Sequence, residues 1–259
     1  MRHDAQTHGA TQRLTTAQRS AKSAGMDLET ITIAARFNGP PGSGNGGYVC
    51  GRMARHIPGA SAVTLRAPPP LDAPLRLTSV DGRIELRDGE TLVADAQAAS
   101  LTLEAPPAPS FAEAEAAAAR YLGHADHRYP TCFVCGGARP ARDGLDLFTG
   151  RVEGRDMVAS PWTPHADLAG ANGLLAPEFI HAALDCPSYW ALAHAGKPAL
   201  LARMTASIDA PAPRIGEKLI VAAWALGSDG RKHRGASALY TAAGALIARA
   251  EALWIEPKG

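Results

Sequence analysis

The sequence predicts a protein of the α+β class, built from two similar units that each place a helix before a run of antiparallel strands. Apolar residues recur at helical spacing in residues 177–191, PEFIHAALDCPSYWA, and strand-like runs follow between residues 200 and 255. Residues 48–57 have the same helical spacing and are also followed by strand-like runs. The order strand, loop, helix and several strands therefore occurs twice.

The two predicted units also match each other in sequence. Residues 92–98, LVADAQA, share their pattern with residues 246–252, LIARAEA, and each segment comes just after a turn that contains glycine. Residues 46–49 and residues 177–180 occupy the same place at the head of the predicted helix. Repeated units usually pack on each other to complete a core. Chance similarity between two alanine-rich strands is the alternative explanation.

The first unit is expected over residues 26–104, after a polar N-terminal arm. Residues 1–25 show no apolar period and are predicted to be disordered. Residues 30–37 have the β-branched character of a strand, and residues 38–47 are too rich in Gly and Pro for a helix or a central strand. After the helix, four strands are predicted at residues 61–66, 75–80, 83–86 and 92–103.

A connector is predicted over residues 105–150, before a second unit over residues 151–259. It opens with a Pro-rich linker, and Ser110 is expected to cap a helix over residues 111–122. The second unit is expected to contain the helix of residues 177–191 and five strands, at residues 156–162, 200–208, 217–226, 235–242 and 246–255.

Composition indicates a soluble cytoplasmic protein. The chain has 259 residues, 46% of them hydrophobic, and a net charge of +1, so nothing indicates a nucleic-acid partner or an acidic lipid surface. No apolar run reaches the roughly 18 residues that span a bilayer, and the N-terminus has no secretory signal, so no membrane partner is expected. Four cysteines in a chain of this length fit a reducing compartment better than a disulfide scaffold.

Asp185 is the single acid in the middle of the apolar run of residues 177–191, since Glu178 lies at its start. An ionised carboxylate among apolar side chains costs several kcal/mol unless a partner satisfies it. Pro187 follows two residues later and cannot donate its own backbone hydrogen bond, so the helix is expected to kink or end beside the acid. Asp185 is therefore either a structural carboxylate, held by backbone groups or an Arg, or a catalytic one.

A helix followed by antiparallel strands, twice in one chain, resembles the double hot-dog fold of acyl-CoA thioesterases. The resemblance covers about residues 30–104 and 156–256, and the local likeness is to the phenylacetyl-CoA type of thioesterase. In that family a curved antiparallel sheet wraps a central helix. A His-Gly-Gly segment opens the helix, and an acid lies two turns further along it.

The resemblance implies a single composite site. Residues 45–47, Asn-Gly-Gly, stand in the place of His-Gly-Gly, but Ala54 occupies the position of the acid in that half. In the second half Asp185 occupies the acid position, while Pro177 and Glu178 replace the two glycines. Since the family's active site combines the glycine loop of one unit with the acid of the other, one site would be complete and the second degenerate.

This combination suits thioester hydrolysis. The backbone N–H groups of Gly46 and Gly47 could stabilise the negative charge that develops on the carbonyl oxygen, and the Asn45 side chain could add another N–H. Asp185 would activate a water molecule as general base or attack the carbonyl carbon directly. A turn that needs positive φ is the alternative reason for the glycines. No cofactor is expected, because the coenzyme A thioester is the substrate.

Four further residues are candidates for substrate binding, namely Tyr48, His181, Ser188 and Tyr189. They lie near the expected helix starts or within one turn of the acid, although such residues also serve as ordinary helix-face residues. For the phosphates of coenzyme A the candidates are Arg203, Arg214 and Lys218, which as scattered basic residues could equally be solvated.

The cysteines support a rival interpretation of the connector. His124, His127, Cys132 and Cys135 follow the pattern H-x2-H-x4-C-x2-C and could supply four zinc ligands. The spacing between the two pairs is short for a zinc finger, so a tight cysteine-containing turn without metal is the favoured interpretation. Cys186 is expected in the core, beside the pocket if the two central helices pack side by side.

Two function classes remain open from the sequence. The first is an acyl-CoA or acyl-carrier thioesterase with the composite site. The second is a hot-dog protein that binds an acyl ligand without hydrolysing it, in which case Asp185 should be held by an Arg or by backbone groups. Edge strands of such units could also mediate a homodimer.

Overall fold

The computed structural model describes residues 25–192 and 198–258, so the predicted disordered arm lies outside the described residues except for Gly25. The described strands form one eleven-stranded sheet in the order β1-β3-β4-β5-β2-β8-β11-β10-β9-β7-β6. The strands are β1 (Met26–Thr32), β2 (Ser61–Leu65), β3 (Pro74–Val80), β4 (Arg83–Asp88), β5 (Thr91–Ala98), β6 (Gly150–Arg151), β7 (Val158–Trp162), β8 (Leu200–Ile208), β9 (Leu219–Asp229), β10 (Lys232–Thr241) and β11 (Leu246–Ile255).

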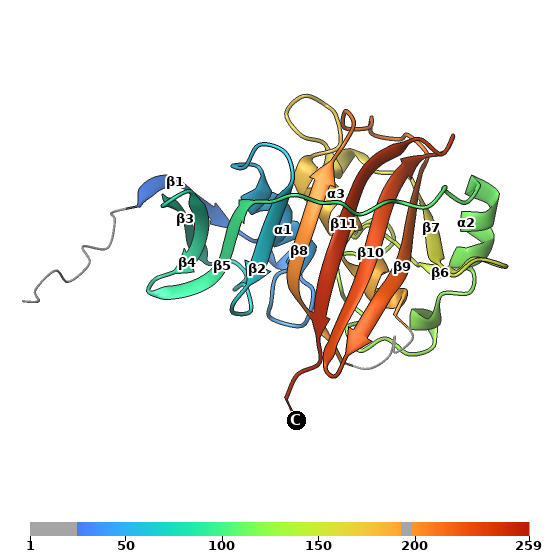
Figure 1. Cartoon of the computed structure of the whole chain (residues 1–259), viewed down its shortest axis with the longest axis horizontal. Coiled ribbons are helices and arrows are strands. Elements are labelled where there is room, and N and C mark those ends of the chain that lie inside the picture. The colour runs from blue at the N-terminus through green and yellow to red at the C-terminus, as the bar shows by residue number, and fades with distance from the viewer. Residues whose placement is uncertain (1–24, 193–197, 259) are drawn as a thin grey trace, which may run out of the picture.

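The sheet consists of two halves that meet at one pair of strands. Strands β2 and β8 pair antiparallel, from Ser61 opposite Ala206 to Thr64 opposite Arg203. Helix α1 (Gly46–Ala54) belongs to the first half and α3 (Pro177–Ala183) to the second, and both lie behind the sheet in Figure 1. The predicted α+β architecture with two tandem helix-and-sheet units is confirmed.

The main core lies between this face of the sheet and the two helices. Val49, Cys50 and Met53 of α1 are fully buried, as are Ile180 and Ala183 of α3. These residues recur at the spacing of one helix face, which is why the sequence pattern located both helices.

The helices α1 and α3 approach closely because α1 has glycines at the contact. A Cβ on Gly51 would lie 2.5 Å from Glu178 Cα, and a Cβ on Gly47 would lie 2.8 Å from the carbonyl oxygen of His181. Only glycine fits at such separations from backbone atoms. The two glycines are four residues apart and therefore lie on one face of the helix.

The helix predicted over residues 177–191 is broken beside the acid, as expected. Helix α3 ends at Ala183 and a short helix, α4 (Cys186–Trp190), begins at Cys186. Asp185 lies between them with φ −76° and ψ −88°, outside the helical region. Pro187 explains the break, because it has no N–H for Ala183 and its ring crowds that carbonyl.

The connector crosses the opposite face of the sheet, in front of the strands in Figure 1. The Tyr240 hydroxyl donates to the Pro106 carbonyl at 2.7 Å, and Arg249 donates to the Leu103 carbonyl at 2.5 Å. Helix α2 (Phe111–Ala118) follows, with a capping box between Ser110 and Glu113, and packs on β7. It covers a second apolar cluster that includes Ala114, Ala117, Met157, Ile220 and Ala222.

Some predicted boundaries differ from the structure. Residues 30–37 do not form one strand, because β1 ends at Thr32 and Ala35–Phe37 is a 3-10 turn that leads into the glycine loop. The strand expected over residues 92–103 ends at Ala98, where the chain leaves the sheet.

None of the helices in the described part of the chain is long and apolar enough to cross a membrane.

Replacement of Gly51 by Ala tests the close helix contact. The added methyl group must push α1 away from α3, so the free energy of unfolding should fall by about 1–3 kcal/mol in urea denaturation. Arg55→Ala is the matched control, because Arg55 reaches Glu178 across the same contact through a half-exposed ion pair of 3.8 Å. That variant should lose at most about 1 kcal/mol. Wild-type stability of Gly51→Ala would contradict the packing described here.

Candidate functional site

The candidate site lies where the break between α3 and α4 meets the N-terminus of α1. Asp185 Oδ2 accepts a hydrogen bond from Asn45 Nδ2 at 2.8 Å and another from the backbone N–H of Gly47 at 2.9 Å. The acid comes from the second half of the chain and both donors come from the first. The predicted pairing of Asp185 with the Asn-Gly-Gly segment is therefore present in the structure.

Asn45 is oriented by its second role as the N-cap of α1. Its Oδ1 accepts a hydrogen bond from the Tyr48 N–H at 2.9 Å. Because the oxygen is used by the cap, the amide nitrogen is the atom left to point at Asp185. The cap thus fixes both the start of the helix and the donor to the carboxylate.

Gly47 allows the acid to come this close. A Cβ at position 47 would lie 2.5 Å from Asp185 Cβ and 3.0 Å from Ala182 Cα. Any side chain here would move the carboxylate away from the N–H that it accepts from. The positive-φ turn considered from the sequence is not the reason for Gly46 and Gly47, since both lie within α1 and neither has positive φ.

Asp185 is buried, with 2% of its surface exposed. Burial raises the pKa of its carboxyl group to about 7, and nearby Cys132 adds to this, while the hydrogen bonds from Gly47 and Asn45 act in the opposite direction. The second oxygen, Oδ1, is buried and has no hydrogen-bond partner among the described residues. One oxygen of the carboxylate is therefore held in place and the other is uncommitted.

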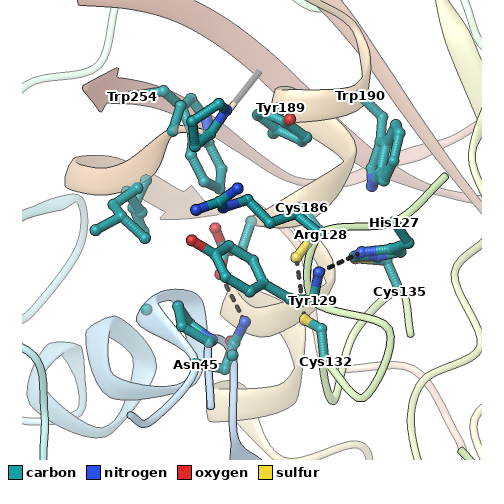
Figure 2. A pocket seen from close by; sticks show the side chains of 18 of the residues that line it. Asn45, His127, Arg128, Tyr129, Cys132, Cys135, Cys186, Tyr189, Trp190 and Trp254 are labelled. Atoms are coloured by element: carbon teal, nitrogen blue, oxygen red, sulfur yellow. Dashed lines mark hydrogen bonds between the residues drawn. The ribbon is translucent and has the colours of Figure 1, made fainter. Parts of the chain in front are cut away.

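Asp185, Asn45 and Gly46 line a cavity of about 70 Å³. The rest of its wall is largely apolar and aromatic, and Figure 2 shows Tyr129, Tyr189, Trp190 and Trp254 around it, with Arg128 extending into the same space. The other lining residues include Gly39, Pro40, Ala199, Leu200 and Leu201. The cavity suits an apolar group whose polar end reaches the carboxylate.

A larger groove of about 430 Å³ adjoins the cavity and shares Gly46, Tyr129 and Leu201 with it. Two basic residues, Arg66 and Arg231, line this groove. The residues expected to meet coenzyme A phosphates lie elsewhere, since Arg203, Arg214 and Lys218 line neither the cavity nor the groove.

Three of the four predicted substrate-binding residues do not reach the cavity. Tyr48 stacks on Phe37 with ring centroids 4.4 Å apart, and its hydroxyl lies beside Arg52. His181 is buried on another side of α3, where its Nδ1–H donates a hydrogen bond to the Pro177 carbonyl at 2.9 Å. Burial lowers the pKa of its imidazole.

Ser188 is the third, and its hydroxyl has two structural partners. It donates to the carbonyl of Asp185 at 2.7 Å and accepts from Trp254 Nε1 at 2.9 Å. Ser188 thereby ties α4 to β11 and fixes the backbone of the acid. Tyr189, by contrast, lines the cavity as predicted.

The cysteine cluster differs from the set considered from the sequence. The thiols of Cys132, Cys135 and Cys186 lie within 4.8 Å of one another, and His127 Nε2 is 3.2 Å from Cys135 Sγ. His124 is not part of this group, because it is exposed and its ring packs on Tyr121 and Phe148. Cys186 could not be assigned to the group from local spacing, since it lies 54 residues from Cys132.

A second, pseudo-equivalent site would combine the helix start of the second half with the acid position of the first half. It has neither an acid nor a free N–H at the start of the helix. Ala54 and Pro177 line a separate pocket, together with His181 and Ala206. Ala54 takes the place of the acid, and Pro177, at the first position of α3, has no backbone N–H. Of the two helix starts, the one at Gly46 can offer its first N–H to a ligand.

No protein-family model and no curated protein sequence matches the chain. Among solved structures, a tesB protein of Mycobacterium avium subsp. paratuberculosis superposes with a TM-score of 0.59 at 11% identity, covering 88% of this chain and 92% of that one. An acyl-CoA thioesterase II TesB2 from Mycobacterium marinum gives a TM-score of 0.55 at 12% identity, covering 91% and 96% of the two chains.

A conserved protein of unknown function with a hot-dog fold from Alicyclobacillus acidocaldarius gives a TM-score of 0.59 at 14% identity, covering 89% of this chain and 93% of that one. These similarities extend over nearly the whole chain. The protein therefore has the tandem hot-dog fold that these structures share, as the sequence resemblance implied.

The interaction between Asn45 and Asp185 can be tested with two substitutions that both keep a good N-cap. Asn45→Ser removes the donor to Asp185, whereas Asn45→Asp places a second carboxylate against it. We expect Asn45→Asp to be less stable than Asn45→Ser by about 1–3 kcal/mol in urea denaturation at neutral pH. Equal stabilities would show that position 45 acts only as a cap.

Proposed function

We propose that the protein hydrolyses an acyl thioester at the composite site, with Asp185 from the second half acting beside the N-terminus of α1. The observation that carries this proposal is the asymmetric environment of the Asp185 carboxylate. Its Oδ2 is fixed by Asn45 and Gly47, while its Oδ1 is buried without a partner among the described residues, in a residue that lines the cavity. A purely structural carboxylate would gain stability by having both oxygens satisfied.

Asp185 can serve as general base in this arrangement. The ionised carboxylate takes a proton from a water molecule, and the water oxygen bonds to the thioester carbonyl carbon to give a tetrahedral oxyanion. As the oxyanion collapses, the carbon–sulfur bond breaks and the thiolate leaves with the proton from Asp185. A pKa near 7 makes the carboxylate a stronger base than an exposed Asp would be. Direct attack by Oδ1, with an anhydride intermediate, is the alternative route.

The Gly46 N–H is the best placed donor for the oxyanion. No hydrogen bond of this N–H is present within residues 25–192 and 198–258, and Gly46 lines the cavity beside Asp185. The N–H of Gly47 is already engaged by the carboxylate. Gly47 and Asn45, predicted as oxyanion donors, thus serve mainly to hold the base, and the helix N-terminus adds its favourable dipole at Gly46.

The shape of the site agrees with a thioester that has a compact apolar acyl group. The aromatic cavity would take the acyl group, with Tyr189 in its wall. The adjoining groove would take the carrier arm, and Arg66 and Arg231 in that groove suit a coenzyme A phosphate. Arg66 also contacts Asp95, which holds its guanidinium in position.

A second function, binding of an acyl ligand without hydrolysis, has one observation in its favour. The Asp185 carboxylate already has a backbone donor in the free protein, as expected for a structural acid. The two proposals differ in what Asp185 does to a bound thioester, so activity and binding must both be measured.

Asp185→Asn is the direct test. The substituted amide keeps the size of the side chain and an oxygen that can accept from Asn45 and Gly47, so the fold should persist. Thiol release from a panel of short-chain, long-chain and aryl acyl-CoA thioesters should fall by at least about 100-fold in kcat/KM. Binding of the thioester, measured by calorimetry, should be retained.

Two results would contradict this proposal, the first for the role of Asp185 and the second for hydrolysis itself. Release of thiol at the wild-type rate by Asp185→Asn would remove the acid from the mechanism. Absence of release from every substrate by the wild type, with tight binding by both proteins, would establish the acyl-binding function instead.

The role of the Gly46 N–H can be isolated with a matched pair of variants. Gly46→Pro removes the N–H, while Gly46→Ala adds a Cβ but keeps it. Proline is favoured at the first position of a helix and already occupies it in α3. Asn45, at ψ 129°, has the extended conformation required before proline. Gly46→Pro should be about 100- to 1,000-fold slower in kcat than Gly46→Ala, and equal kcat values would exclude this N–H as the oxyanion donor.

A further inference from the structure

The three clustered thiols lie at one side of the cavity, and their chemistry is not used in thioester hydrolysis. Cys132 Sγ and Cys186 Sγ are 3.6 Å apart, and Cys135 Sγ lies within 4.8 Å of both. All three side chains are buried and none forms a disulfide. Sulfur atoms bound to one tetrahedral zinc ion, with zinc–sulfur bonds of about 2.3 Å, are separated by distances of this size.

The turn that presents the first two thiols is built to direct them at one point. The Gly136 N–H donates to the Cys132 carbonyl at 2.9 Å. A Cβ on Gly136 would lie 2.5 Å from both the Cys132 nitrogen and the Pro130 oxygen, so the turn requires glycine after the Cys-x-x-Cys pair.

His127 contributes a hydrogen bond to this cluster. Its Nδ1 accepts from the Tyr129 N–H at 3.0 Å, so in the neutral ring the proton resides on Nε2. That Nε2 is 3.2 Å from Cys135 Sγ and donates to it. A donor of this kind stabilises a metal-bound thiolate from outside the coordination sphere.

We propose that Cys132, Cys135 and Cys186 bind one zinc ion as thiolates, with His127 donating a hydrogen bond to the Cys135 sulfur. Three buried thiolates form a soft ligand set that favours zinc over magnesium or calcium. Figure 2 shows the cluster at the edge of the cavity. The remaining coordination position is left to water.

The ion would connect two segments that are distant in sequence. Cys132 and Cys135 belong to the connector, whereas Cys186 opens α4 directly after Asp185. Zinc binding would therefore fix the connector against the residue next to the acid and hold that wall of the cavity. This inference concerns metal binding alone and does not depend on whether a thioester is hydrolysed.

Metal analysis of the full-length protein, purified under reducing conditions without added chelator, is the first test. We expect about one zinc per chain. Cys132→Ser, Cys135→Ser and Cys186→Ser should each lose it, while Cys50→Ser is the matched control because Cys50 is equally buried but lies outside the cluster. His127→Ala should weaken zinc binding by about 10- to 100-fold, as removal of a hydrogen bond to a ligand does, and His124→Ala should leave it unchanged.

Reconstitution with Co²⁺ provides a readout that does not depend on the stability of the variants. The cobalt form of the wild type should show thiolate-to-metal charge transfer in the near ultraviolet and the visible bands of a tetrahedral site. Wild-type protein with four titratable thiols, no bound zinc and no charge-transfer band with Co²⁺ would overturn the proposal. Retention of zinc by the Cys132→Ser, Cys135→Ser and Cys186→Ser variants would also overturn it.

Discussion

The hydrogen bonds from Asn45 and Gly47 to Asp185 are the interaction on which the site depends. They join the two halves of the chain at the contact between α1 and the break after α3, at 2.8 and 2.9 Å. The contact requires glycine at position 47, because any Cβ there would displace the acid. The same three residues, Asn45, Gly47 and Asp185, therefore determine how the helices pack, how α1 is capped and where the carboxylate lies.

The fold supplies two pseudo-equivalent positions, and the two positions carry different groups. Gly46 and Asp185 line one cavity. Its counterpart is lined by Pro177, which has no backbone N–H, and by Ala54, which stands in the place of the acid. The continuous sheet through β2 and β8 keeps the two halves in a fixed relation. A tandem chain can in this way vary its two halves independently, which two identical subunits cannot do.

Local patterns predicted much of this arrangement from the sequence. Helical periodicity located both helices, and Pro187 predicted the break beside Asp185. Roles that depend on contacts between distant segments were not predicted. The hydroxyl of Ser188, a predicted substrate-binding residue, accepts from Trp254 of β11 instead, and Cys186 joins Cys132 only because the connector returns to α4. The Gly47–Gly51 spacing was a sequence signal of close helix packing that local analysis overlooked.

The proposed hydrolysis can be tested with a crystal structure of the protein bound to an acyl-CoA analogue in which a methylene group replaces the thioester sulfur. We expect the ketone oxygen within about 2.7–3.2 Å of the Gly46 nitrogen. We also expect Asp185 Oδ1 to face the carbonyl carbon and the acyl group to lie beside Tyr189. A ligand bound next to Ala54 and Pro177, or one whose carbonyl leaves the Gly46 N–H without a partner, would contradict it.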